Sequence, residues 1–191
     1  MTVPDVAAKR EEWKEKVPGL SADHLVFLDE CGVNTDMTRR YGRAVGGERC
    51  VDDAPLNTPT TTTILSSIQL DGSTVPVTYR GGTTGQKFVQ YLTDSLLPNL
   101  LPGDIVVMDN LRSHHVAQVR PLIEGAGCSL LYLPPYSPDF NPIEKMWSKI
   151  KAVLRKKKIR NVDALPPAIS AAFSTVSSSN IRGWFHSCSI C

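Results

Sequence analysis

Three short, uninterrupted apolar runs constrain the fold of this chain more than any other feature of its sequence. "HLVFLDE" spans residues 24–30, "DIVVMDN" spans residues 104–110 and "SLLYLPP" spans residues 129–135. Runs of this length without polar alternation are typical of strands that are covered on both faces of a sheet. We therefore expect all three to be buried strands in the middle of one sheet.

The segments around these runs predict helices and one hairpin. Residues 61–72 and 73–82 have strand character and turn at Asp71-Gly72. Helical patterns predict four helices, over residues 5–17, 84–100, 114–127 and 142–158. A further helix is predicted to start near Asp163. A hairpin followed by alternating strands and helices indicates an α/β protein, with a mixed central sheet flanked by helices.

Composition is that of an ordinary globular domain. The 191 residues are 41% hydrophobic and 21% charged, which is enough for one domain with a substantial core. No run approaches the roughly 18 apolar residues of a membrane span, and the N-terminus lacks the apolar core of a signal peptide. Five irregularly spaced cysteines are expected to be reduced thiols. These features predict a cytoplasmic protein without a membrane segment.

Basic residues are unevenly distributed along the chain. The net charge is only +2, but residues 149–160, "KIKAVLRKKKIR", hold seven basic residues and no acidic one. Residues 38–43, "TRRYGR", hold three more. Such runs are more often solvated surface than nucleic-acid sites, so charge alone favours solvated surface.

Two of the apolar runs lead directly into an aspartate, Asp29 in "VFLDE" and Asp109 in "VVMDN". Carboxylates at the C-terminal ends of adjacent parallel strands converge, and α/β sheets bind ligands at those ends. An aspartate after a strand can equally cap the next turn. With two aspartates on matching strands, the two interpretations are evenly balanced.

A third acid, Glu144, begins a long helix after four prolines within nine residues. In "LPPYSPDFNPIEKMWSKIK", Asn141 suits the N-cap, Pro142 the first helical position and Glu144 a capping box. Helical spacing places an apolar stripe toward the core: Ile143, Met146, Trp147, Ile150, Val153 and Leu154. Ser148, Lys151 and Arg155 continue the flank that Glu144 begins, which a capping role does not explain. The prolines stiffen the approach to the helix, and at this point Asp139 and Glu144 are equal candidates for the third acid.

Three converging carboxylates without His or Cys ligands suit a hard cation such as Mg²⁺. Two such ions, roughly 3.5–4 Å apart, can clamp the attacking and leaving oxygens of a phosphodiester. A basic flank can hold the phosphate backbone. Chemistry and charge together point to phosphoryl transfer on nucleic acid.

The sequence also resembles the three catalytic blocks of DDE transposases, in the bacterial insertion-sequence branch of the mariner-like superfamily. The matching segments are "LVFLDECGVNTDMTRRYGRA", "VVMDNLRSHH" and "LLYLPPYSPDFNPIEKMWSKIK", and 34 residues lie between Asp109 and Glu144, as is usual in that branch. The resemblance implies an RNase H-like fold and an endonuclease that cuts transposon ends and joins them to target DNA. It also implies a metal-binding and catalytic triad of Asp29, Asp109 and Glu144, chosen over Glu30 and Asp139, with two Mg²⁺ or Mn²⁺ ions.

The same resemblance implies further roles. Asn110 and His114 match "DNxxxH" of the second block and are expected to orient Asp109 or to contact DNA. We expect the DNA-contacting side chains to be Arg39, Arg40, Arg43, Lys145, Lys151, Arg155, Lys156, Lys157 and Lys158. The partners implied are transposon-end and target DNA, with a dimer in the DNA complex, in a bacterial cytoplasm at the nucleoid.

One departure from the family concerns the N-terminal side. Family members carry helix-turn-helix modules before the catalytic part, whereas fewer than thirty residues precede Asp29 here. We therefore expect a helix or linker over residues 1–20 and the catalytic domain over residues 21–191. Two alternatives remain: a catalytically silent remnant that still binds DNA, and a Mg²⁺-binding receiver-type signalling domain, which would need a Lys after a later strand and a purely parallel sheet.

Overall fold

A five-stranded mixed sheet forms the centre of the protein. The computed structural model describes residues 3–53, 55 and 61–190. Its strands are β1 (Leu25–Val33), β2 (Thr62–Ile68), β3 (Val77–Arg80), β4 (Ile105–Met108) and β5 (Ser129–Tyr132), in the order β3-β2-β1-β4-β5. β1, β4 and β5 are parallel, while β2 is antiparallel to both β1 and β3. The expected mixed sheet is confirmed, and its antiparallel part excludes the purely parallel sheet of a receiver domain.

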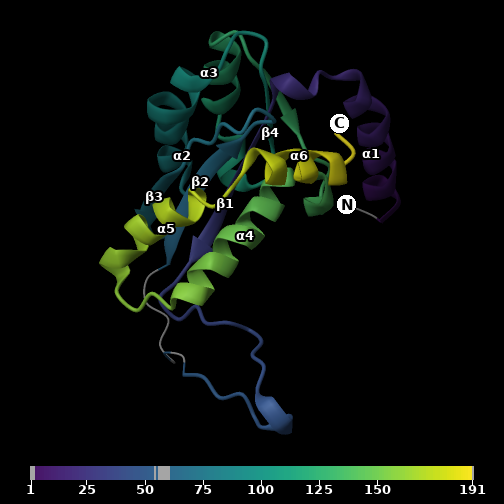
Figure 1. Cartoon of the computed structure of the whole chain (residues 1–191). Helices are drawn as coiled ribbons and strands as arrows, with labels where there is room; N and C mark the ends of the chain where they lie inside the picture. The colour runs from purple at the N-terminus through teal and green to yellow at the C-terminus, as the bar shows by residue number, and fades with distance from the viewer. Residues whose placement is uncertain (1–2, 54, 56–60, 191) are drawn as a thin grey trace.

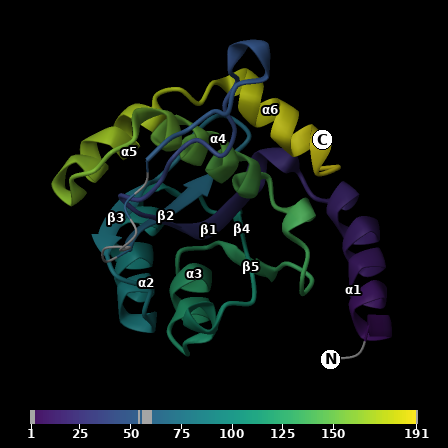
Figure 2. The same cartoon turned by 90° about the horizontal axis from the view of Figure 1, so that it is seen from below.

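Helices cover both faces of this sheet (Figures 1 and 2). The helices are α1 (Val3–Lys16), α2 (Gly85–Tyr91), α3 (Val119–Gly125), α4 (Pro142–Lys157), α5 (Leu165–Phe173) and α6 (Ser178–Ser187). One core contains Phe27, Ile64 and Val107 and packs against α4, α5 and α6, while the other contains Val26, Leu28 and Met108 and packs against α2 and α3. Alternate residues of β1 therefore enter different cores, as the pleat of a strand requires.

The N-terminal helix α1 lies beside the sheet rather than on it (Figure 2). Its Trp13 is 5% exposed and stacks on Phe140, with the ring centroids 6.3 Å apart. Val17, just after the helix, is also buried in the α4-side core. Arg10 donates to both carboxylate oxygens of Asp139, at 2.9 and 2.7 Å. Helix α1 is thereby attached to the proline-rich segment before α4.

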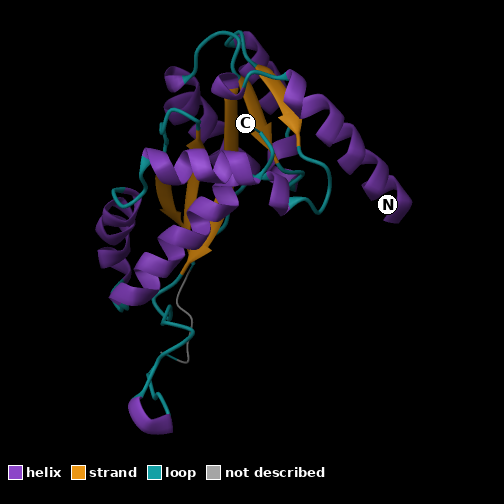
Figure 3. Ribbon diagram, turned by 45° about the vertical axis from the view of Figure 1, so that its right-hand side comes forward, coloured by secondary structure: helices purple, strands orange, loops and turns teal. Residues whose placement is uncertain are grey.

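Between β1 and β2 the chain leaves the body as a long arm (Figures 1 and 3). A 3-10 turn, Val45–Gly47, lies near its tip, and residues 39–53 are exposed. Arg160 holds the base of the arm through the carbonyl oxygens of Thr35 and Met37, at 2.7 and 3.1 Å. Lys158 forms an ion pair with Asp52. Basic residues after α4 thus anchor the arm to the body.

Several predicted boundaries were wrong. β1 continues past Asp29 to Val33, because β2 pairs with it after β4 has ended. The helix expected over residues 84–100 is α only to Tyr91, and a π turn, Leu92–Leu96, and a 3-10 turn follow. The helix expected over residues 114–127 starts as a 3-10 turn, Arg112–His115, and becomes α at Val119. After residue 163 there are two helices, α5 and α6, where one start was predicted.

Two further sequence expectations concern membranes and cysteines. Within the part of the chain that the structure describes, no helix combines the length and the apolar character that crossing a bilayer requires. Cys31, Cys50, Cys128 and Cys188 are free thiols, and Cys191 lies outside the described residues.

Candidate active site

Asp29 and Asp109 are brought together by the pairing of β1 with β4. In this parallel pair Phe27 faces Val107 and Leu28 faces Met108, so Asp29 and Asp109 occupy the next positions of the two chains. Asp29 has the same strand parity as Phe27 and Val33, which enter the α4-side core. It is 8% exposed, whereas Asp109, just beyond the end of β4, is half-buried. Both carboxylates therefore lie at the point where β1 and β4 diverge, beneath α4.

Glu144 reaches the same region from the first turn of α4. Asn141 caps this helix by accepting a hydrogen bond from the backbone N–H of Ile143 at 3.4 Å, and Pro142 occupies the first helical position. The predicted capping box was wrong, because the Asn141 backbone N–H donates to the carbonyl of Pro138 at 3.1 Å. Glu144 is exposed, and its carboxylate has no hydrogen bond or ion pair to any of the described residues. The acid is therefore free to bind a ligand.

The three carboxylates line one cleft of about 670 Å³. Asp29 in the middle of β1 and the segment just after β4 form its floor, and the segment from Leu131 to Pro138 forms one wall. Helix α1 contributes Lys9, Glu12, Trp13 and Lys16 to the lining. The proline-rich segment and the N-terminal helix therefore shape the space into which the acids project.

Burial and mutual repulsion perturb the acids of this cleft. Burial, together with the neighbouring charges of Glu144 and Asp109, raises the pKa of Asp29 to about 8. The Glu144 side chain is exposed at the rim of the cleft, but partial loss of water around its carboxylate raises its pKa, with Lys151 opposing and Asp109 reinforcing the effect. For Asp109, burial acts to raise the pKa, but hydrogen bonds from His114 and from the Leu111 backbone hold it below its ordinary value. A positive charge in the cleft would relieve this repulsion.

Two buried side chains hold Asp29 and Asp109 in place: Trp147, which the sequence did not assign to the site, and His114, which was expected to orient Asp109 or to contact DNA. Trp147, which was predicted only as a core residue, donates its indole N–H to Asp29 Oδ2 at 3.0 Å. His114 is fully buried and lies 2.7 Å from Asp109 Oδ1 through Nδ1 and 3.1 Å from Glu30 Oε2 through Nε2. Burial acts to lower the pKa of His114, but the two carboxylates outweigh it and raise this pKa to about 9. A protonated His114 therefore ties Glu30 of β1 to Asp109.

Glu30 and Asn110 have structural roles beside the site. Glu30 lies on the face of β1 opposite to Asp29, where it accepts a hydrogen bond from His114. Asn110 Nδ2 donates to the carbonyl oxygen of Leu133 at 2.6 Å, which joins the chain after β4 to the chain after β5. His114 thus contacts Asp109 as expected, while Asn110 positions the strand ends.

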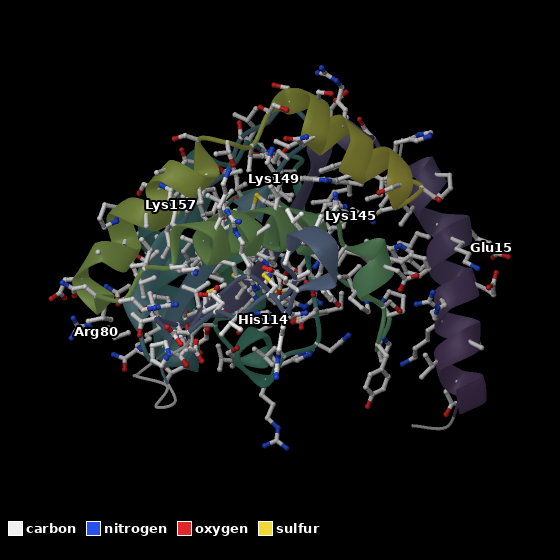
Figure 4. The ribbon with its side chains drawn as sticks, turned by 60° about the horizontal axis from the view of Figure 1, so that its bottom comes forward. Glu15, Arg80, His114, Lys145, Lys149 and Lys157 are labelled. Atoms are coloured by element: carbon white, nitrogen blue, oxygen red, sulfur yellow. The ribbon has the colours of Figure 1, made fainter. Side chains whose placement is uncertain are left out.

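The predicted DNA-contacting residues are spread over two parts of the molecule. Arg39, Arg40 and Arg43 are exposed on the arm. Lys151 is close enough to Glu144 to oppose the rise in its pKa, and Arg155 follows one helical turn later on the same flank. Figure 4 labels Lys145, Lys149 and Lys157 along α4, and Lys149 donates a hydrogen bond to Asn180 of α6. Lys156 and Lys157 are exposed, while Lys158 pairs with Asp52.

The acids fit a hard divalent cation in their chemistry. All three donors are carboxylates in one cleft, and burial together with their mutual repulsion raises the pKa of Asp29 and of Glu144. Among residues 3–53, 55 and 61–190, no three His, Cys, Asp or Glu side chains lie close enough together to hold one ion. The donor set is therefore present at one cleft, and its side chains must rotate toward one another to close around an ion.

Solved structures share this fold. The Mos1 transposase in its paired-end complex with the left transposon end matches with a TM-score of 0.78 and 16% identity over 97% of this chain. The mariner Mos1 paired-end complex with Mg matches with a TM-score of 0.81 and 16% identity over 97% of this chain. The chain spans 59% of the Mos1 chain in each of these two structures. The isolated catalytic domain of Mos1 mariner transposase matches with a TM-score of 0.70 and 14% identity over 97% of this chain and 89% of that domain. These matches confirm the RNase H-like fold.

Sequence comparisons give the family. Comparison with curated proteins finds no match. The family model described as DDE superfamily endonuclease matches residues 24–166, which is more than half of the chain and includes Asp29, Asp109 and Glu144. The chain therefore belongs to the DDE superfamily endonucleases.

Proposed function

We propose that this protein is a transposase catalytic domain that cleaves DNA at transposon ends and joins the ends to target DNA. One observation supports the proposal most: Asp29 of β1, Asp109 just after β4 and Glu144 of α4 all line the same cleft. Membership of the DDE superfamily endonucleases supports it. So does the likeness to Mos1 transposase structures in complex with transposon-end DNA.

Asp29, Asp109 and Glu144 would hold one or two Mg²⁺ or Mn²⁺ ions in this cleft. Such hard cations would promote deprotonation of the attacking water or DNA 3′-hydroxyl and neutralise charge on the phosphate. The crystal structures of Mos1 complexes with Mg and with Mn support this choice of metal.

The remaining groups of the site position the carboxylates. Trp147 fixes one oxygen of Asp29, and His114 fixes one oxygen of Asp109. His114 and the Leu111 backbone N–H both bond Oδ1 of Asp109, which leaves its Oδ2 to the cleft, while the Asp29 carboxylate accepts from Trp147 and from the Glu30 backbone N–H. Glu144 lies on a helix whose start is fixed by Asn141 and by the prolines before it. Catalysis then depends on positioning and charge neutralisation, without a protein nucleophile.

Basic residues on the Glu144 flank of α4 would hold the DNA backbone. Lys151 and Arg155 continue from Glu144 along the helix, so phosphates on either side of the scissile one would meet them. Arg39, Arg40 and Arg43 extend the basic surface along the arm. We place the protein in the bacterial insertion-sequence branch, acting as a dimer on DNA at the nucleoid, with residues 21–191 as the catalytic domain.

The test is metal-dependent cleavage of DNA by Glu144→Gln. Glu144 makes no capping bond that glutamine would lose, so the variant should fold like wild type. Wild type should cut DNA carrying a transposon end when Mg²⁺ or Mn²⁺ is added. Glu144→Gln, which loses a proposed metal ligand, should lose more rate than the about 10- to 100-fold that changing an outer partner of a metal site costs. Glu124→Gln, at an exposed residue of α3 paired with Arg120, is the matched control. Equal cleavage by Glu144→Gln and wild type would remove Glu144 from the chemistry.

A further inference from the structure

Tyr136 is an exposed aromatic residue in a strained position at the candidate active site. Its side chain is 87% exposed although it lies in the proline-rich wall of the cleft. Its backbone φ is 56°, in the left-handed region that a bulky residue adopts rarely and at a cost of about 1–3 kcal/mol. Neither the core nor the fold requires an aromatic ring there, because the ring makes few contacts with the protein.

The residues around Tyr136 are firmly held, so its exposure does not come from a loose loop. Pro134 is buried before it, and Ser137 is 4% exposed after it. Ser137 Oγ donates to the carbonyl of Pro135 at 3.2 Å and accepts a hydrogen bond from Arg10 at 2.8 Å. Arg10 also lies over the Phe140 ring, 4.3 Å from its centroid. Contacts with α1 thus fix the wall and leave the tyrosine ring in solvent.

The surroundings of the ring are those of a nucleic-acid site. Tyr136 lines the same cleft as the three carboxylates, and Leu111, 43% exposed, lines it from the segment after Asp109. Lys9 and Lys16 of α1 also line the cleft, together with the acidic Glu12. An exposed aromatic face with nearby lysines is the combination that binds single-stranded nucleic acid, by stacking a base and pairing with the backbone.

We propose that Tyr136 is a stacking platform for an unpaired nucleobase adjoining the phosphate in the cleft, with Lys9 and Lys16 contacting neighbouring phosphates of that strand. This inference rests on the proposed function and adds a base-binding site to it. A phosphate can reach carboxylates at the floor of a cleft more easily when its strand is separated from the duplex, which exposes a base. Stacking that base on a fixed ring would offset part of the unstacking free energy and place the phosphate over Asp29 and Asp109.

The stacking is tested with DNA that carries 2-aminopurine at an unpaired position next to the scissile phosphate, because stacking on tyrosine quenches its fluorescence. Tyr136→Phe retains the ring, whereas Tyr136→Asn removes it but keeps a residue that tolerates the left-handed backbone. We expect quenching by wild type and Tyr136→Phe, and none by Tyr136→Asn. The dissociation constant of Tyr136→Asn for the unpaired-end DNA should rise about 5- to 150-fold, the equivalent of losing one stacked base. The affinity of Tyr136→Asn for fully paired duplex DNA should equal that of wild type. The melting temperature of the variant protein should be equal to or above that of wild type, because asparagine tolerates the left-handed backbone.

The lysines are tested by Lys9→Gln and Lys16→Gln, with Lys14→Gln as the matched control. Lys14 is on the same helix but pairs with Glu11 at 2.8 Å and does not line the cleft. Each cleft variant should reduce the salt dependence of unpaired-end binding by about one phosphate contact, and the control should not.

The outcomes separate this inference from the proposed function. Quenching that persists in Tyr136→Asn, or equal weakening of duplex and unpaired-end binding, would overturn the stacking site even if wild type cleaves DNA. A change in oligomeric state of Tyr136→Asn with unchanged DNA binding would also overturn it, because Tyr136 would then be a protein contact. Absence of metal-dependent cleavage by wild type, together with Tyr136-dependent quenching, would overturn the proposed chemistry and leave the base-binding site in place.

Discussion

Replacing Asp29 by asparagine should stabilise the metal-free protein. The carboxyl is 8% exposed and faces Glu144 and Asp109, and burial with their charges raises its pKa to about 8. An asparagine has nearly the same shape, and its Oδ1 can accept the hydrogen bond that Trp147 now donates to Asp29. The substitution therefore removes an ionisable group from an unfavourable place and keeps its main contact.

The size of the effect follows from the two pKa values. Between pH 3.8, the ordinary value, and about pH 8, the folded protein holds a proton that the unfolded chain has released, so the free energy of unfolding falls as the pH rises. At 1.36 kcal/mol per pH unit, Asp29 costs the folded state about 4 kcal/mol at pH 7 and about 2 kcal/mol at pH 5. Asp29→Asn should have a free energy of unfolding higher than wild type by up to about 4 kcal/mol at pH 7 and about 2 kcal/mol at pH 5. This difference should fall to about zero near pH 4.

Urea unfolding followed by tryptophan fluorescence, at pH 5 and pH 7 in EDTA, measures the difference in free energy of unfolding between Asp29→Asn and wild type at each pH. Asp139→Asn is the control of opposite sign, because the hydrogen bond from Arg10 lowers the pKa of this exposed carboxyl. It should lose at most about 1 kcal/mol at pH 7. Millimolar Mg²⁺ should stabilise wild type more than Asp29→Asn, since only the native carboxylate set binds it tightly. An Asp29→Asn protein that is less stable than wild type at pH 7, or a gap of the same size at both pH values, would refute the reasoning.

Three further predictions concern groups around the carboxylates. Trp147→Phe leaves Asp29 without its indole donor, so it should lose about 1–3 kcal/mol in urea unfolding and cleave DNA more slowly; unchanged cleavage would show that the bond does not position Asp29. His114 has a pKa raised to about 9, so its stabilising contribution is fully present below pH 6.5 and is lost as the pH rises through 9. The urea midpoint of wild type should therefore fall over this pH range, and that of His114→Gln should not. An equal fall in His114→Gln would show that other groups cause the pH dependence. Lys151→Gln combined with Arg155→Gln should reduce the salt dependence of DNA binding by about two phosphate contacts without changing Mg²⁺-induced stabilisation, and an unchanged slope would place both residues outside the DNA path.

The sequence predicted the parts of the fold that local patterns encode. The three apolar runs became the parallel strands β1, β4 and β5, and the hairpin turns at Gly72, whose φ of 108° suits glycine. The end of β1 could not be read from its own residues, because its extension to Val33 depends on pairing with β2. Helix α6 has a capping box between Ser177 and Asn180, but its first turn is polar and lacks the apolar periodicity from which a helix is predicted.

The supports of the site depend on contacts between residues far apart in the chain. Trp147 meets Asp29 across 118 positions, and His114 meets Glu30 across 84. A buried tryptophan or histidine needs a hydrogen-bond partner, and this need was the signal available in the sequence. Which partner it finds is set by the packing of α4 against β1 and of the 3-10 turn Arg112–His115 against α2, which brings His114 to Glu30 of β1. The same holds for Asp139, an equal candidate for the third acid by pattern, whose partner Arg10 lies on α1.

The measurement that tests the central claim most directly is the anomalous scattering of Mn²⁺ soaked into crystals of the protein. If the cleft is a metal-dependent DNA-cleaving site, manganese should be found between Asp29, Asp109 and Glu144, with an oxygen of each side chain in its coordination sphere and with Trp147 and His114 still bound to the two aspartates. Manganese bound elsewhere, or carboxylates that do not share an ion at saturating Mn²⁺, would contradict the assignment.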